Sequence, residues 1–98
     1  MNGKEICELC ESELASSFHH LIPRTLHSNK WFKKRFTRAD MAAGIDVCRG
    51  CHRAIHSLIP REKELGRHFH TVESLRNHPL VGRYVRWKRR QSAPGGAF

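Results

Sequence analysis

The sequence predicts a small α+β domain that is held together by a four-cysteine zinc site and extended by helices at its C-terminal end. Ninety-eight residues suffice for one domain with a limited hydrophobic core. Two C-x2-C pairs, Cys7 with Cys10 and Cys48 with Cys51, have the spacing of zinc-binding turns. Short apolar segments lie near both pairs, and the chain after residue 60 carries a series of helix signals.

Two strands are expected between the cysteine pairs. Residues 14–22 have β-compatible character and are followed by Pro23, which indicates a strand that enters a loop. Residues 45–47 form a short apolar segment that runs directly into the second cysteine pair. Both expected strands therefore lead toward residues that could hold a metal.

A helical segment is expected between these strands, over residues 28–44. Ser28 can cap its start, and Thr37 followed by Asp40 suggests a second cap within the segment. Gly44 is expected to mark the stop. Phe32 and Phe36 recur at helical spacing, which favours packing in the core over stacking on bases.

The chain after the second cysteine pair is expected to be helical. Caps and prolines predict four helices, over residues 52–58, 61–67, 71–77 and 79–91. In the last of them, one apolar face is formed by Leu80, Val81, Tyr84 and Val85. Residues 1–91 are therefore interpreted as a single domain, with a core over 7–58 and a helical extension over 61–91, followed by a disordered tail at 92–98.

The charge of the chain predicts a polyanionic partner. Eighteen Lys and Arg residues against nine Asp and Glu give a net charge of +9, which points to nucleic acid. An anionic membrane is the alternative, but no apolar run approaches the ~20 residues that span a bilayer. The N-terminal residues do not resemble a signal peptide, so a cytoplasmic protein is expected. Paired cysteines in that compartment favour a metal over disulfides or unpaired thiols.

Four cysteine thiolates would complete the tetrahedral shell of a zinc ion. Such a site leaves no open position for water, so Cys7, Cys10, Cys48 and Cys51 are expected to hold a structural Zn²⁺ that performs no chemistry. The two pairs would then meet at one point. Because His52 directly follows Cys51, the site would also bring histidines of the two regions together.

The histidines near the cysteine pairs predict a second metal site. His52 and His56 are four residues apart and would project from one face of a helix. His19 and His20 are adjacent, so in a strand they would point to opposite sides, and one could bind metal while the other stays free. The alternatives are ordinary surface histidines, or one histidine that replaces a cysteine on the structural zinc.

The segments CELC, HHLIPR and CRGCHRAIH together resemble the HNH endonuclease family, which has a ββα-metal catalytic core. The pattern HH…H-x3-H is also similar to the bacteriocin nucleases of that family, which lack the cysteines. The resemblance covers about residues 7–56. It implies a fold with a ββα-metal core and a single-metal endonuclease that hydrolyses DNA phosphodiester bonds.

The resemblance also implies roles for single residues. His19 and His52 match metal ligands, His56 matches the additional helical ligand, and His20 matches the general base. Three imidazoles without a carboxylate favour Zn²⁺, Ni²⁺ or Mn²⁺ over Mg²⁺ as the catalytic metal. The chain departs from the family at Ala43, where a central Asn is expected. A backbone carbonyl, Asp46 or another group would then have to orient His20.

Two basic clusters are expected to contact phosphates of DNA without reading the base sequence. The partner would be double-stranded DNA, with single-stranded DNA as an alternative, and the sequence indicates no oligomeric state. Arg24, just after HHLIP, is the best candidate to contact phosphate near the metal. The alternative function is a zinc-containing module that binds nucleic acid without catalysis. The clusters comprise Lys30, Lys33, Lys34, Arg35 and Arg38, and Arg83, Arg86, Arg89 and Arg90.

Overall fold

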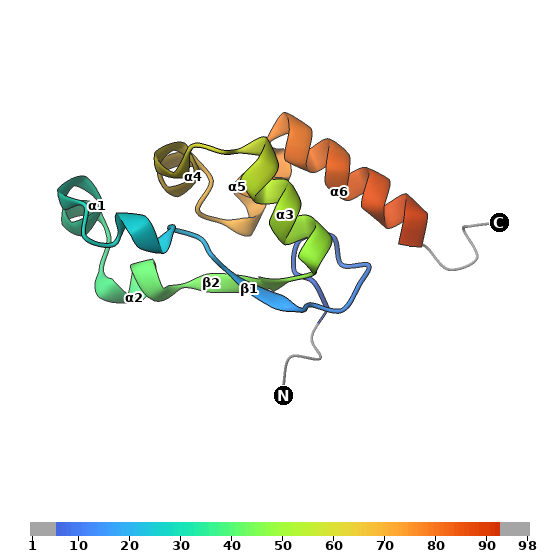
Figure 1. Ribbon diagram of the computed structural model, residues 1–98, viewed down its shortest axis with the longest axis horizontal. Helices are drawn as coiled ribbons and strands as arrows, with labels where there is room; N and C mark the ends of the chain where they lie inside the picture. Colours follow the sequence, from blue (N-terminus) through green and yellow to red (C-terminus); the bar gives the residue numbers. More distant parts are fainter. Residues whose placement is uncertain (1–5, 93–98) are drawn as a thin grey trace.

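The computed structural model describes residues 6–92 as an α+β fold (Figure 1). In this part of the chain a two-stranded antiparallel sheet is accompanied by six α-helices and one 3-10 helix, which confirms the predicted α+β class; the ββα-metal core stays a prediction. The expected tail lies outside the described residues apart from Ser92. The elements are β1 (Ser17–His20), η1 (Arg24–Leu26), α1 (Lys30–Arg35), α2 (Arg38–Ala42), β2 (Gly44–Val47), α3 (Arg49–Leu58), α4 (Glu62–His68), α5 (Val72–Asn77) and α6 (Pro79–Ser92).

The two strands pair with Ser17 opposite Val47 and His19 opposite Ile45. Side chains alternate between the faces of the sheet, so these four residues share one face. His19, Ile45 and Val47 are buried there, beneath α3, which lies across the sheet (Figure 1). The neighbours of His19 in β1 therefore face the other way. The alternation expected for the two adjacent histidines is confirmed.

β1 is shorter than the strand expected over residues 14–22. Leu14 instead forms an isolated bridge with Ile6, and the amide of Leu21 donates to the carbonyl of Ala43 at 3.2 Å. One end of the expected strand thus pairs with the N-terminal segment, and the rest pairs with β2 and the residue before it. Hydrogen bonding to two different segments explains why the apolar run does not form one continuous strand.

The helix expected over residues 28–44 is two short helices. Asn29, and not Ser28, caps α1, because its side-chain oxygen accepts from the amides of Trp31 and Phe32. Phe36 has an extended backbone that ends α1, and its ring stacks on Phe32 with centroids 6.0 Å apart. The predicted cap at Thr37 is confirmed as a capping box with Asp40.

Gly44 was expected to mark the stop of a helix, but it begins β2. A Cβ atom at this position would lie 2.3 Å from the Cζ of Phe18 and 2.4 Å from the carbonyl oxygen of His19. Glycine is therefore required by the close approach of the two strands and not by a turn. The preceding helix, α2, ends at Ala42, with Ala43 extended after it.

Two apolar clusters stabilise the fold. The larger combines the four cysteines with residues of β2, α3, α4, α5 and α6, among them Val47, Ile55 and Leu65. The smaller surrounds Phe32, which is buried as expected, and packs on Ile22, Leu26 and Met41. α4 bridges both clusters. A Cβ at Gly66 would lie 3.0 Å from the Phe32 ring, so this glycine allows α4 to approach Phe32 closely.

The C-terminal helices follow their predicted order, with bounds that differ by a few residues. Thr71 caps α5 through a capping box with Ser74, and α6 begins at Pro79. Val81 and Val85 are buried on the predicted apolar face of α6, whereas Leu80 is 47% exposed. Leu80 is displaced by about 100° around the helix axis from Val81, so it lies at the edge of the buried face. None of the helices that the structure describes is long and apolar enough to cross a bilayer.

Candidate metal centres

The first candidate centre consists of the four cysteines, which are free and completely or almost completely buried. Their sulfur atoms all lie within 4.8 Å of one another, and Sγ of Cys10 is 4.0 Å from Sγ of Cys48. In each pair the amide of the second cysteine points at the sulfur of the first. The distances are 3.5 Å from Cys10 to Cys7 and 3.4 Å from Cys51 to Cys48. Amide groups aimed at sulfur stabilise thiolates.

The protonation of these cysteines also favours a cation between them. A hydrogen bond with Cys51 lowers the pKa of Cys7 to about 4. The same hydrogen bond, together with burial, raises the pKa of Cys51. Burial likewise raises the pKa of Cys10. Four sulfurs cannot all be thiolates in this enclosed space unless positive charge compensates them, so the donor set fits a structural metal ion.

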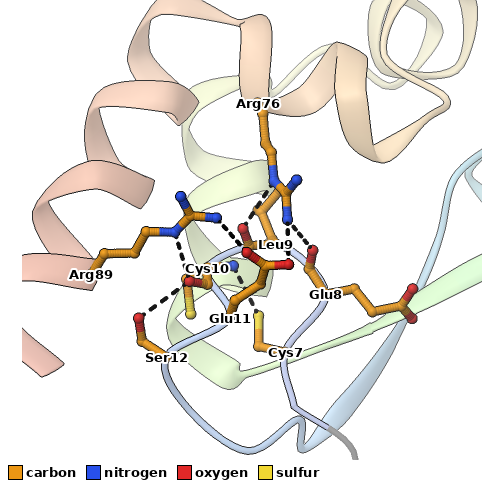
Figure 2. Close-up of polar contacts among 8 residues, drawn as sticks. All are labelled: Cys7, Glu8, Leu9, Cys10, Glu11, Ser12, Arg76 and Arg89. Atoms are coloured by element: carbon orange, nitrogen blue, oxygen red, sulfur yellow. Dashed lines mark hydrogen bonds and ion pairs between the residues drawn. The ribbon is translucent and has the colours of Figure 1, made fainter. Parts of the chain in front are cut away.

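Two arginines from the C-terminal helices hold the first cysteine turn in place (Figure 2). Arg76 donates to the carbonyl oxygens of Leu9 and Glu8 at 3.2 and 2.8 Å, and Arg89 donates to that of Cys10 at 2.9 Å. Both guanidinium groups also contact the carboxylate of Glu11. Glu11 has a φ of 58°, the left-handed conformation that ends the turn. The arginines therefore satisfy backbone groups of a strained segment.

The second candidate centre consists of His19, His52 and His56. Cys48 caps α3, so the helix begins inside the second cysteine pair and presents the two later histidines toward β1. The ring centroid of His19 lies 5.4 Å from that of His52 and 5.3 Å from that of His56. One nitrogen from each ring falls within 4.8 Å of the others. The three histidines predicted as metal ligands thus lie together, separate from the cysteines.

His19 has the environment of a metal ligand. It is 1% exposed, and neither of its ring nitrogens has a hydrogen-bond partner. Burial, followed by the proximity of His56 and His52, lowers its pKa to about 4, which keeps the ring neutral. Burying a polar ring without a partner costs free energy. A metal ion bound by the three neutral imidazoles would remove that cost, so the donor set fits a divalent cation.

Ser17 was not predicted as a site residue, yet its hydroxyl lies 3.0 Å from Nδ1 of His52. The same oxygen lies 3.3 Å from the carbonyl oxygen of Val47, to which it donates. Ser17 precedes His19 by two residues and shares its face of β1, which is the signal in the sequence that could have identified it. Burial and His56 lower the pKa of His52.

His20, the predicted general base, lies on the opposite face of β1. Its ring packs edge-on against Phe18 at 5.0 Å and lies 5.8 Å from the ring of His27. Burial, then the neighbouring His27 and Arg24, lowers its pKa. Within residues 6–92 no hydrogen bond to the His20 ring is formed. His27, which the sequence did not single out, is its nearest imidazole neighbour.

Two groups that could replace the central Asn, the carbonyl of Ala43 and Asp46, have other partners. The carbonyl of Ala43 accepts from the amide of Leu21, and Asp46 lies opposite Phe18 in the sheet. The amide of Asp46 donates to the carboxylate of Glu8 at 2.7 Å. Neither residue forms a hydrogen bond with His20, so the ring is positioned by packing.

A cavity of about 260 Å³ joins the histidines of both faces at the end of β1. His19, His52 and His56 line it together with His20 and Arg24, so Arg24 lies near the candidate metal ligands, and its contact with phosphate stays a prediction. Glu62 also lines it, and its carboxylate accepts from the hydroxyl of Thr25 at 2.5 Å. The cavity therefore combines possible metal ligands, a possible base and one arginine.

The basic residues of α1 and α6 lie at opposite ends of the molecule (Figure 1). The five predicted in the first cluster are exposed, although Arg35 stacks on the ring of Trp31 at 4.1 Å. In the second cluster, Arg89 is bound to the first cysteine turn and is less available than expected. Neighbouring Lys88 pairs with Glu13 at 2.8 Å. The remaining members of that cluster are exposed and are Arg83, Arg86 and Arg90.

Comparisons with family models, curated proteins and solved structures gave no match to this chain. The geometry of the two centres is therefore the basis for any statement about function. The four-cysteine cluster is consistent with a bound structural metal ion.

Proposed function

We propose that the protein is a metal-dependent endonuclease of the HNH type that hydrolyses DNA phosphodiester bonds. The observation that carries the proposal is the buried ring of His19, whose two nitrogens are unpartnered beside His52 and His56. A module that only binds nucleic acid has no need of three converging imidazoles. Their location in a cavity with His20 and Arg24 supports chemistry on a phosphate group.

His19, His52 and His56 would hold the catalytic divalent metal, with Zn²⁺, Ni²⁺ or Mn²⁺ favoured over Mg²⁺. When bound, such a metal supplies stabilisation of negative charge on the phosphate and the leaving 3′ oxygen. Ser17 fixes the orientation of the His52 ring. His19 lies on β1, and His52 and His56 lie on α3. The order β1, β2 and α3 supports a ββα-metal core.

His20 would act as the general base that takes a proton from the attacking water. Its lowered pKa keeps the ring neutral near pH 7, which is the form that accepts a proton. Arg24, in the same cavity, would contact a phosphate oxygen and orient the strand. The exposed lysines and arginines of α1 and α6 would bind further phosphates, independently of base sequence.

The proposal is tested by cleavage of supercoiled plasmid with added Zn²⁺, Ni²⁺, Mn²⁺ or Mg²⁺. We expect nicking by the parent protein and loss of at least about a hundredfold in rate for His20→Ala, with DNA binding retained. His68→Ala, an exposed histidine on α4, is the matched control and should cleave like the parent. Equal cleavage by His20→Ala and the parent would eliminate His20 as the base.

The second candidate function is a zinc-containing module that binds nucleic acid without cleaving it. It is favoured by Ala43, which replaces the expected Asn, and by the packing of His20 without a hydrogen bond to its ring among the described residues. Absence of cleavage with every metal, together with retained DNA binding, would favour this module.

A further inference from the structure

A second cavity, of about 540 Å³, lies on the face of β1 that carries His20. Residues of η1, α1 and α2 line it, and none of its lining residues is acidic. The ring of His27 is fixed there, because its Nε2 donates to the carbonyl of Ile22 at 2.8 Å. This concentration of positive charge suits an anionic ligand. The basic and imidazole side chains that line the cavity are His20, Arg24, His27, Lys33 and Arg38.

The same cavity also has an apolar part. Phe36 and Met41 line it, and both belong to or pack against the smaller apolar cluster around Phe32. The exposed ends of the basic side chains therefore stand beside a surface that is fixed by the fold. A ligand that fits both parts carries a phosphate and a flat apolar group, as a nucleotide does. The volume lies within the range of about 300–1,000 Å³ that is usual for small-molecule pockets.

This cavity adjoins the one at the histidine cluster, because His20 and Arg24 line both. A nucleic acid strand with one phosphate beside His19, His52 and His56 would thus have its neighbouring nucleotide within reach of the second cavity. Lys33 on α1 and Arg38, the first residue of α2, line the second cavity but not the one at the histidine cluster.

We propose that this second cavity binds one nucleotide of the nucleic acid strand, adjacent to the phosphodiester at the histidine cluster. Its phosphate contacts Arg24, Lys33 and Arg38, and its base packs against Phe36 and Met41. The inference rests on the proposed function for the position of the strand. It assigns the five basic residues of the first cluster unequal roles, since Lys33 and Arg38 line the cavity but Lys34 does not.

The test measures binding of thymidine 5′-monophosphate and of deoxyribose 5-phosphate to the full chain by NMR titration. Lys33→Ala and Arg38→Ala are each expected to weaken thymidine monophosphate binding about tenfold, the loss typical of a charged phosphate contact. Lys34→Ala is the matched control, because it removes the same charge from the same exposed helix outside the cavity. Its effect should stay below about twofold.

Two results would overturn the proposal. If Lys33→Ala and Lys34→Ala weakened nucleotide binding equally, the nucleotide would be attracted by the overall positive charge of the protein and not held at a specific site. Equal affinity for the two probes would show that the base makes no contact. Because no cleavage is measured, the outcome is independent of catalysis. The protein could fail to cleave DNA while Lys33→Ala and Arg38→Ala still weaken nucleotide binding selectively. In that case the nucleotide cavity stands and the endonuclease proposal fails.

Discussion

The hydroxyl of Ser17 lies 3.0 Å from Nδ1 of His52 and 3.3 Å from the carbonyl oxygen of Val47. A hydroxyl has one hydrogen, and a carbonyl can only accept, so Ser17 donates to Val47 and accepts from Nδ1 of His52. The proton of a neutral His52 ring is therefore on Nδ1, and Nε2 keeps the lone pair that a metal requires. The pairing of β1 with β2 thus determines the tautomer of a candidate ligand on α3.

Ser17→Ala is expected to weaken metal binding at the histidine cluster by about tenfold to a hundredfold, the usual cost of removing a partner of a metal-bound histidine. The measurement is a Co²⁺ titration of the zinc-loaded protein, since the absorption of Co²⁺ distinguishes nitrogen from sulfur ligands. Ser16→Ala, an exposed neighbour, is the control and should bind like the parent. Unchanged affinity in Ser17→Ala would remove Ser17 from the site.

Cys48→Ser is expected to destabilise the whole fold. The four buried sulfurs belong to the larger apolar cluster, and a structural metal contributes directly to folding free energy. A loss of roughly 3 kcal/mol or more should lower Tm by more than about 12 °C in a domain of this size. Thermal unfolding followed by circular dichroism measures it. A strong chelator added to the parent protein should have the same effect, and a parent that melts unchanged after metal removal would contradict the prediction.

Arg76→Ala and Arg89→Ala are each expected to lower the free energy of unfolding by about 1–2 kcal/mol. Arg76→Ala leaves the carbonyls of Glu8 and Leu9 without their side-chain donor, and Arg89→Ala leaves the carbonyl of Cys10 with only the hydroxyl of Ser12 as a side-chain donor. Arg86→Ala is the matched control on α6, where the side chain is exposed, and should change stability by less than about 0.5 kcal/mol. Urea unfolding measures all three. If Arg86→Ala costs as much as the other two, the contacts in Figure 2 are not the cause.

The residues that could be assigned from the sequence were those whose role depends on local spacing. Each of these features depends on residues only a few positions apart. They are the two cysteine pairs, the helical pair His52 and His56, and the caps at Thr37 and Thr71. The contacts of Arg76 and Arg89 with the first cysteine turn join residues 67 to 79 positions apart, and no local pattern indicates them. For the same reason the sequence predicts a phosphate contact for Arg89 and does not indicate its contacts with the first cysteine turn.

Gly44 shows why a glycine can be misread. In sequence it follows a helical segment and resembles a stop signal, but its role depends on a strand that lies 24 residues or more earlier in the chain. Only the pairing of His20 with Gly44 reveals that there is no room for a side chain. Similarly, Leu80 belongs to the apolar pattern of α6 yet is exposed, because the pattern does not show which part of that face the rest of the fold covers.

Gly44→Ala is therefore expected to destabilise the protein and to disturb the histidine cluster. The added methyl would lie 2.4 Å from the backbone oxygen of His19, which cannot move without shifting β1. Overpacking of this kind costs about 1–3 kcal/mol, measured by urea unfolding. Because His19 belongs to the displaced strand, Co²⁺ binding at the histidines should weaken at least about fivefold. This factor corresponds to a loss of about 1 kcal/mol in binding free energy.

Gly50→Ala is the matched control for this substitution. The atoms nearest to its added methyl would be side-chain atoms of α6, Oη of Tyr84 at 2.6 Å and Nζ of Lys88 at 3.1 Å, and not the backbone of the strand that carries His19. Alanine also gains about 1 kcal/mol over glycine within a helix such as α3. We therefore expect Gly50→Ala to change stability by less than about 1 kcal/mol and to leave Co²⁺ binding unchanged. Equal losses of Co²⁺ affinity in both variants would show that strand spacing at Gly44 does not position His19.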